Sequence, residues 1–96
     1  MLVKKHVNQG RLFLAICDSE LIGKKFAEGN KQIDLNSDFY KGEKINEKDL
    51  LELLESVYMI NAVGIKSTGF LIKNKKISKG DIIFIDKIPI AQILFF

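Results

Sequence analysis

The chain has 96 residues, of which 47% are hydrophobic, 28% charged and 9% aromatic, a composition typical of globular proteins rather than disordered or collagen-like ones. The single cysteine, Cys17, excludes a disulfide scaffold and a multi-cysteine zinc site, and the single histidine, His6, excludes a His-rich metal cluster. No apolar run approaches the roughly 18–20 residues of a membrane span, and the N-terminus lacks the apolar region of a signal peptide. We therefore expect a cytoplasmic protein that does not associate with membranes.

The net charge of +3 is too small to diagnose a nucleic-acid-binding protein, but the charges are unevenly distributed. Residues 1–31 carry six basic and three acidic side chains, residues 43–55 carry five acidic side chains and two lysines, and residues 66–79 carry five lysines and no acid. Such blocks can direct a polyanion to one face of a protein. They can also be ordinary solvated faces, and both interpretations stay open.

The first half of the chain predicts strands. Residues 2–8 and 11–17 are apolar runs joined by Gln9-Gly10, which is typical of a hairpin turn. Residues 11–17 are apolar at both alternating sets of positions, so this strand should lie in the interior of a sheet. Asp18 is a candidate N-cap for a short helical turn over residues 19–22, and a short strand is expected at 31–35.

The second half predicts two helices and two strands. Asn46 and Asp49 resemble a capping box that opens a helix over residues 47–60, whose apolar residues recur at helical spacing. A break at 61–64 and a second helix over 64–75 follow, and then strands at 82–85 and 88–95, the last beginning at Pro89 or lying at an edge. We expect one compact α+β domain over residues 1–96. Its mostly antiparallel or mixed sheet should carry the helices, in the order strand, strand, short helix, strand, helix, helix, strand, strand.

No nucleotide-binding, nucleophile-elbow or zinc-protease motif occurs in the chain, and we expect neither a cofactor nor a metal. The densest polar segments are residues 23–29 and 39–43, which combine glycine, lysine and aromatic residues. Backbone amides and lysines there can hold a phosphate while an aromatic ring stacks on a base. The alternative is that Phe26, Phe39 and Tyr40 belong to the core. We expect Cys17 to be buried and inert.

The chain also resembles a known family. Residues 17–29 (Cys-Asp, then Leu-Ile-Gly-Lys-Lys-Phe-Ala-Glu-Gly), 39–43 (Phe-Tyr-Lys-Gly-Glu), 61–64 (Asn-Ala-Val-Gly) and 88–92 (Ile-Pro-Ile-Ala-Gln) look like the small archaeal proteins of domain-of-unknown-function family 424. The resemblance implies an archaeal source and a compact stand-alone α/β protein, and it supplies no activity. Members tend to have Glu where this chain has Ile65 and His where it has Ile90, which lowers the expectation of catalysis.

Three hypotheses follow. The first is a non-catalytic module that binds RNA or a ribonucleoprotein, with phosphates at Arg11, Lys24, Lys25 and Lys41 and a base stacked on Tyr40 or Phe39. The second is a protein-interaction subunit or homodimer that uses the apolar C-terminal strand, residues 93–96, with the acidic helix face binding a basic partner. The third, which we rank last, is an enzyme that uses Asp18, Lys24 and Glu28 on a small phosphorylated substrate.

Overall fold

Strand β2 (Arg11–Cys17) is the centre of the fold. In the computed structural model, which describes residues 1–95, it lies between antiparallel β1 (Leu2–Asn8) and parallel β6 (Val57–Val63). A two-residue turn joins β1 to β2, with φ of +53° at Gln9 and +75° at Gly10, the left-handed values that a tight hairpin requires. The last four residues of β2 have no exposed surface. The predicted hairpin and the interior position of β2 are confirmed.

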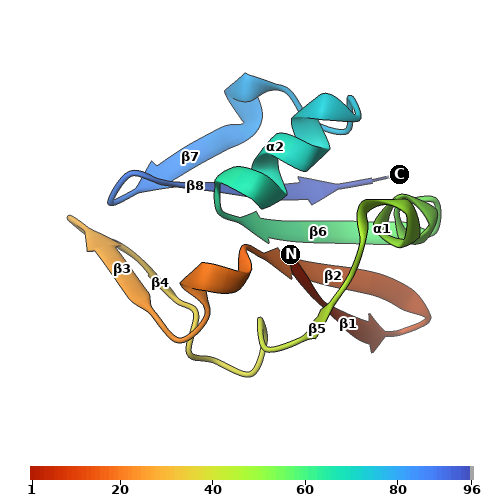
Figure 1. The fold of residues 1–96 in the computed structure, drawn as a ribbon, viewed down its shortest axis with the longest axis horizontal. Coiled ribbons are helices and arrows are strands. Elements are labelled where there is room, and N and C mark those ends of the chain that lie inside the picture. The colour runs from red at the N-terminus through yellow and green to blue at the C-terminus, as the bar shows by residue number, and fades with distance from the viewer. Residues whose placement is uncertain (96) are drawn as a thin grey trace.

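Six strands form one mixed sheet in the order β5-β1-β2-β6-β8-β7 (Figure 1). The edges are β5 (Glu43–Lys44) and β7 (Ile82–Ile85), and a two-residue turn at Asp86-Lys87 joins β7 to the inner strand β8 (Ile88–Leu94). A separate antiparallel hairpin consists of β3 (Lys25–Glu28) and β4 (Lys31–Asp34). With the two helices, this arrangement confirms the predicted α+β class.

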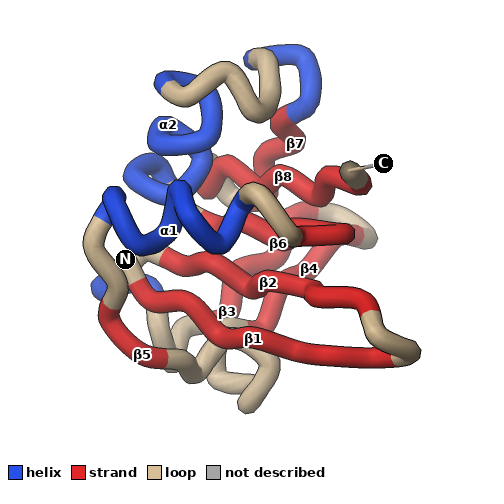
Figure 2. The backbone as a smooth tube through the Cα atoms, turned by 90° about the vertical axis from the view of Figure 1, so that its right-hand side faces the viewer, coloured by secondary structure: helices blue, strands red, loops and turns tan. Residues whose placement is uncertain are grey.

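Both helices, α1 (Glu47–Leu54) and α2 (Ile65–Lys73), lie on one face of the large sheet (Figure 2). The Asn46 side chain caps α1 by accepting a hydrogen bond of 2.8 Å from the Asp49 N–H, as predicted. The core on this face joins one alternating set of strand residues to the apolar stripes of the helices. Its buried members are Val3, Leu14, Ile16, Leu50, Leu54, Val57, Ile60, Ala62, Phe70, Leu71, Ile77 and Ala91. Among residues 1–95, no helix has the length and apolar character needed to cross a bilayer.

The opposite face of the sheet is covered at one end by the β3–β4 hairpin and the segment that follows it. A second apolar cluster lies there, with Cys17, Leu35, Val63, Ile85 and Ile90 as its buried members. Phe26 and Ile33 of the hairpin pack against this cluster, as does Tyr40. The interpretation that Phe26 and Tyr40 belong to the core is therefore confirmed.

The predicted helix over 47–60 was wrong in its second half, because α1 ends at Leu54 and residues 57–63 form β6. A bulge explains the misleading pattern. Leu12 pairs with Val57 whereas Phe13 pairs with Met59, so Tyr58 is an extra residue in β6. The bulge places buried Val57 and Ile60 three positions apart, which imitates helical spacing. The predicted break at 61–64 is likewise strand as far as Val63.

Other boundaries differ less. The short turn is a 3-10 turn over Ser19–Leu21, and a further 3-10 turn, Lys79–Asp81, precedes β7. Strands β3 and β5 were not predicted from sequence. Strand β8 is an inner strand, paired with β6 on one side and β7 on the other, and Pro89 is its second residue. The expected last strand therefore is not an edge strand, and the expectation for Phe96 lies outside the described residues.

Candidate functional site

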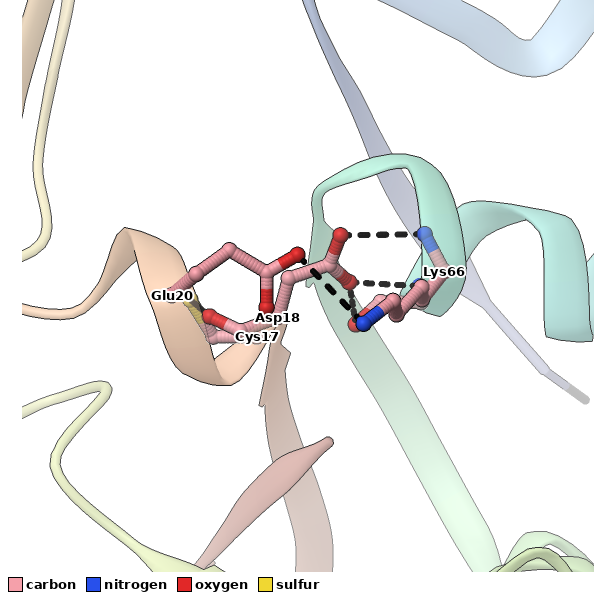
Figure 3. A network of polar contacts seen from close by, with 5 residues as sticks. Cys17, Asp18, Glu20 and Lys66 are labelled. Carbon is pink, nitrogen blue, oxygen red and sulfur yellow. Dashed lines mark hydrogen bonds and ion pairs between the residues drawn. The ribbon is translucent and has the colours of Figure 1, made fainter.

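Asp18, the first predicted site residue, caps helix α2 from a distant part of the chain. Its carboxylate is buried, and it accepts hydrogen bonds from the Lys66 N–H at 3.0 Å, the Ser67 N–H at 2.7 Å and the Ser67 hydroxyl at 2.8 Å (Figure 3). Gly64, the residue before α2, has no side chain to supply this cap. The carboxylate also places negative charge at the positive end of the helix dipole. This geometry supports a structural role for Asp18.

Gly64 makes the close approach of Asp18 to the helix feasible. It is buried and has φ of +112°, a conformation that L side chains rarely adopt. A Cβ atom built on it would lie 2.2 Å from the Asp18 Cγ. Outside this cap, the Lys66 ammonium lies 3.6 Å from the Glu20 carboxylate, an exposed ion pair. A hydrogen bond to its own backbone, and then the Lys66 charge, lower the pKa of Glu20.

Cys17 has no exposed surface, as predicted, and its thiol donates to the Asp18 carbonyl at 3.2 Å. Burial, and then the neighbouring Asp18 and Glu20 charges, raise the pKa of this thiol to about 12. Since the nucleophile is the thiolate, the folded protein keeps this cysteine unreactive at neutral pH.

Three more predicted site residues, Lys24, Lys25 and Glu28, lie on or beside the β3–β4 hairpin. The Lys25 ammonium pairs with Asp34 across the hairpin at 3.8 Å, and Glu28 accepts the Asp86 N–H at 2.9 Å. The two described hollows of the 1–95 structure, one beside α1 and one on this hairpin, are lined by neither Asp18, Lys24 nor Glu28. The three residues of the enzyme hypothesis, Asp18, Lys24 and Glu28, therefore do not come together in either hollow.

The most distinctive surface is the part of the sheet that the hairpin leaves uncovered. Because residues paired across strands share a face, the register defines two rows there. The first row is His6, Phe13, Met59 and Leu94, and the second row is Lys4, Ala15, Asn61 and Gln92. We call these two rows, together with Arg11 and Tyr58, the open face, within which Ala15 of the second row has no exposed surface of its own. Its residues include no carboxylate.

Aromatic side chains gather on the open face. The bulge in β6 brings the Tyr58 ring edge-on to the Phe13 ring, with 5.5 Å between centroids. The Arg11 guanidinium lies 4.5 Å from the centre of the Tyr58 ring, a cation–π contact. At the β1 side, the His6 ring stacks on the Phe39 ring with 4.4 Å between centroids, and its Nε2–H donates a 3.0 Å hydrogen bond to the Phe39 carbonyl. Arg11, which was predicted to contact phosphate, thus lies within this aromatic group. Tyr40, which was predicted to stack on a base, lies edge-on to Phe39.

A groove of about 740 Å³ adjoins the open face at the edge of β1. Its basic wall consists of lysines from β1 and from the segment around β5, namely Lys4, Lys5, Lys41 and Lys44. Lys4 belongs to both surfaces, and its ammonium donates to the Asp38 carbonyl beside Phe39. The acidic residues Glu43, Asp49 and Glu52 also line the groove. Lys41, one of the predicted site residues, therefore lines the same groove as Lys4 of the open face, whereas Lys24 and Lys25 are on a different element.

Sequence reasoning missed Phe13, Tyr58 and Met59 as candidate site residues. Phe13 was assigned to a strand buried on both sides, and Tyr58 to the apolar stripe of a helix. All three are half-buried in the structure. The available signal was the run Val57-Tyr58-Met59-Ile60, whose β-branched and aromatic residues favour a strand over the end of a helix.

The comparisons with known proteins concern the fold and the family. The structure matches the crystal structure of an uncharacterized conserved protein from Methanopyrus kandleri, with a TM-score of 0.81 and 20% sequence identity, over 96% of this chain and 88% of the other. At that identity the likeness shows the fold alone. The search of curated proteins found no match. The family model described as "Protein of unknown function (DUF424)" matches residues 6–96, and the chain belongs to that family.

Proposed function

We propose that the protein is a non-catalytic module that binds single-stranded RNA, alone or within a ribonucleoprotein, on the open face. One observation carries the proposal: the uncovered end of the sheet presents Phe13, Tyr58 and a guanidinium among side chains that include no carboxylate. A β-sheet with half-exposed aromatic residues is a surface on which unpaired bases stack.

The two aromatic groups offer separate stacking positions. Arg11 covers the Tyr58 ring, so a base can stack on the guanidinium plane or against Phe13 beside it. Phe39, which is 37% exposed, offers a second position over His6 on the neighbouring strand. Asn61 and Gln92 lie side by side in the second row and can form hydrogen bonds with base edges.

Basic side chains at both ends of the open face support binding of the phosphate backbone. Arg11 lies at the end of the open face beside the β1–β2 turn, and Lys4 and Lys41 line the groove at the other end. Three phosphate contacts predict that log Kd changes with log salt by a slope of about 2 for a single strand. From about 50 to about 300 mM salt, the affinity should then fall roughly 40-fold.

The test is fluorescence anisotropy with a single-stranded RNA of about ten nucleotides and with the matching duplex, across the salt series. We expect the single strand to bind more tightly than the duplex. Tyr58→Ala, which removes the ring that supports the Arg11 guanidinium, and Phe39→Ala should each weaken binding roughly 5- to 150-fold, because loss of one stacking position costs about 1–3 kcal/mol. Arg11→Ala should weaken binding and reduce the salt slope by about 0.7.

The double variant Lys24→Ala/Lys25→Ala is the matched control for charge, and it also tests the other surface predicted from sequence. It removes two positive charges from the β3–β4 hairpin without altering the open face. We expect it to retain the stacking-dependent affinity. If this variant abolishes binding while Tyr58→Ala and Phe39→Ala leave it intact, the site is the hairpin and the open-face proposal fails. Weak binding of RNA by the native chain that does not change with salt would overturn the proposal of RNA binding altogether.

A further inference from the structure

We propose that Asn61 and Gln92 together select adenine, so that the open face prefers single-stranded RNA that contains an accessible adenine. This inference deepens the proposed function and rests on it. Asn61 belongs to β6 and Gln92 to β8, and the two residues pair directly across these antiparallel strands. Residues opposite each other in such strands have Cβ atoms roughly 4.5–5.5 Å apart, so both side chains can reach one base. We call these two side chains the amide pair.

The amide pair lies in a part of the sheet where amide side chains are unusual. Strands β6 and β8 are both interior strands, and asparagine is depleted in strands. The residues two positions away on the same face are all apolar, namely Met59, Val63, Ile90 and Leu94. Apolar surroundings raise the cost of leaving a polar group without a partner. A base that fails to pair with these amides is therefore disfavoured at this position.

The protein itself does not hold either amide. The side chains of Asn46 and Asn74 form hydrogen bonds with the backbone, whereas those of Asn61 and Gln92 form none with other residues of the described 1–95. Asn61 is half-buried and Gln92 is exposed. Within that part of the chain no buried side-chain polar atom lacks a partner, so the amide of Asn61 reaches the surface. Both amides are free to turn toward a ligand.

The hydrogen-bonding groups of two adjacent amides match those of adenine. Each amide has a carbonyl acceptor beside an N–H donor. Two amides with their carbonyls side by side present the order donor, acceptor, acceptor, donor. Adenine presents the complement, because N1 accepts, the N6 amino group donates two hydrogens and N7 accepts. The two carbonyls therefore accept from N6, while one amide N–H donates to N1 and the other donates to N7.

The other three bases leave part of the amide pair unsatisfied. Cytosine has an amino group beside N3, but it has a C–H group where adenine has N7. Guanine and uracil have a carbonyl oxygen in place of the adenine amino group, and this oxygen cannot donate to either amide carbonyl. A polar group that loses its partner in a partly desolvated site lowers affinity. Adenine is therefore the base that forms all four hydrogen bonds.

The first row of the open face supplies a contact for the face of this adenine. Met59 is half-buried and Leu94 is 49% exposed, and each lies two residues from its member of the amide pair. A base whose edge meets the amide pair can rest on these side chains, and the Met59 sulfur makes a favourable contact with an aromatic ring. Met59 also pairs with Phe13, so the adenine position adjoins the stacking position there.

The test is fluorescence anisotropy with single strands of about ten nucleotides, all uridine except for A, C, G or U at the central position. The strand with adenine should bind at least about 5-fold more tightly than each of the others. Replacing this adenine by 7-deazaadenine removes the N7 acceptor and should weaken binding roughly 2- to 10-fold. Replacing it by purine, which lacks the N6 amino group, should abolish the preference.

Variants of the protein assign the preference to the amide pair. Asn61→Leu and Gln92→Met keep similar side-chain volumes but remove the amides. Both should bind the all-uridine strand like the native chain and lose the preference for adenine, a pattern that unfolding does not produce. Gln32→Met is the matched control, because Gln32 is exposed on β4 in the separate hairpin, and this variant should keep the preference.

The outcomes separate this inference from the proposed function. Equal binding of all four strands, or a preference for another base, overturns adenine selection and leaves RNA binding intact. A preference that persists in both Asn61→Leu and Gln92→Met overturns its assignment to the amide pair. Failure of the native chain to bind any of the strands overturns both the inference and the proposed function.

Discussion

Replacing Asp18 by alanine should destabilise the protein strongly, although Asp18 is far in sequence from the helix that it caps. Its carboxylate accepts three hydrogen bonds from the first turn of α2. Ser67 is fully buried, so its N–H would be left unsatisfied at a cost of about 1–3 kcal/mol. The Lys66 N–H is part-buried and can reach water, so its loss should cost about 0.5–1.5 kcal/mol. The Ser67 hydroxyl can rotate to another acceptor.

Together these costs predict a loss of about 1.5–4.5 kcal/mol, a large part of the roughly 5–15 kcal/mol by which small domains are stable. Urea unfolding followed by circular dichroism measures it, and the midpoint should fall by roughly 1–2 M with an unchanged slope. Asp38→Ala, at an exposed carboxylate, is the control and should cost less than about 0.5 kcal/mol. An Asp18→Ala loss no larger than that of the control would refute the structural role of this carboxylate.

The remaining predictions concern two glycines and the cysteine. Gly64→Ala should destabilise the protein, but less so in an Asp18→Ala background, because the new Cβ then no longer meets the carboxylate. If the losses of stability from the two substitutions simply add in the double variant, this contact is contradicted. Gly69→Ala should stabilise the protein by about 0.5–1 kcal/mol in the same assay, because Gly69 is exposed inside α2 and an added Cβ meets nothing within 4 Å; a lower midpoint would contradict the helix assignment. The pKa of Cys17 is raised from 9.0 to about 12 on folding, so the unfolded chain loses its thiol proton first and stability should fall between these pH values by up to about 1.4 kcal/mol per pH unit. Cys17→Ala should lack this part of the alkaline loss, and equal pH profiles of the two proteins would contradict it.

Sequence patterns predicted the parts of the fold in which local signals and tertiary packing agree. Gly10 in the first turn and Asn46 at the start of α1 are residue types that the local geometry favours at those positions. Helix α1 was extended too far because a β-bulge at Tyr58 imitates helical spacing. A bulge is set by the partner strand, and the pattern of one strand alone does not reveal it.

The candidate site was harder to predict because it depends on which strands become neighbours. Arg11 and Tyr58 are 47 positions apart in the sequence, and only the parallel pairing of β2 with β6 brings them into contact. Asp18 was predicted as the N-cap of the turn over residues 19–22, but its side chain does not cap that turn, and its role as the cap of α2 follows from a tertiary contact with Ser67. Local composition singled out the lysine- and glycine-rich segments, and the structure places Lys41 in the groove that Lys4 also lines and the hairpin lysines on a different element.

RNA binding at the open face is tested most directly by an NMR titration of the labelled protein with single-stranded RNA, following the backbone amides and the Met59 methyl group. We expect the largest shift changes on Phe13, Tyr58, Met59 and their neighbours in the two rows of the open face. The β3–β4 hairpin and the exposed surface of α1 should change little. Shift changes concentrated at Lys24 and Lys25, or no saturable change anywhere, would contradict the assignment of RNA binding to the open face.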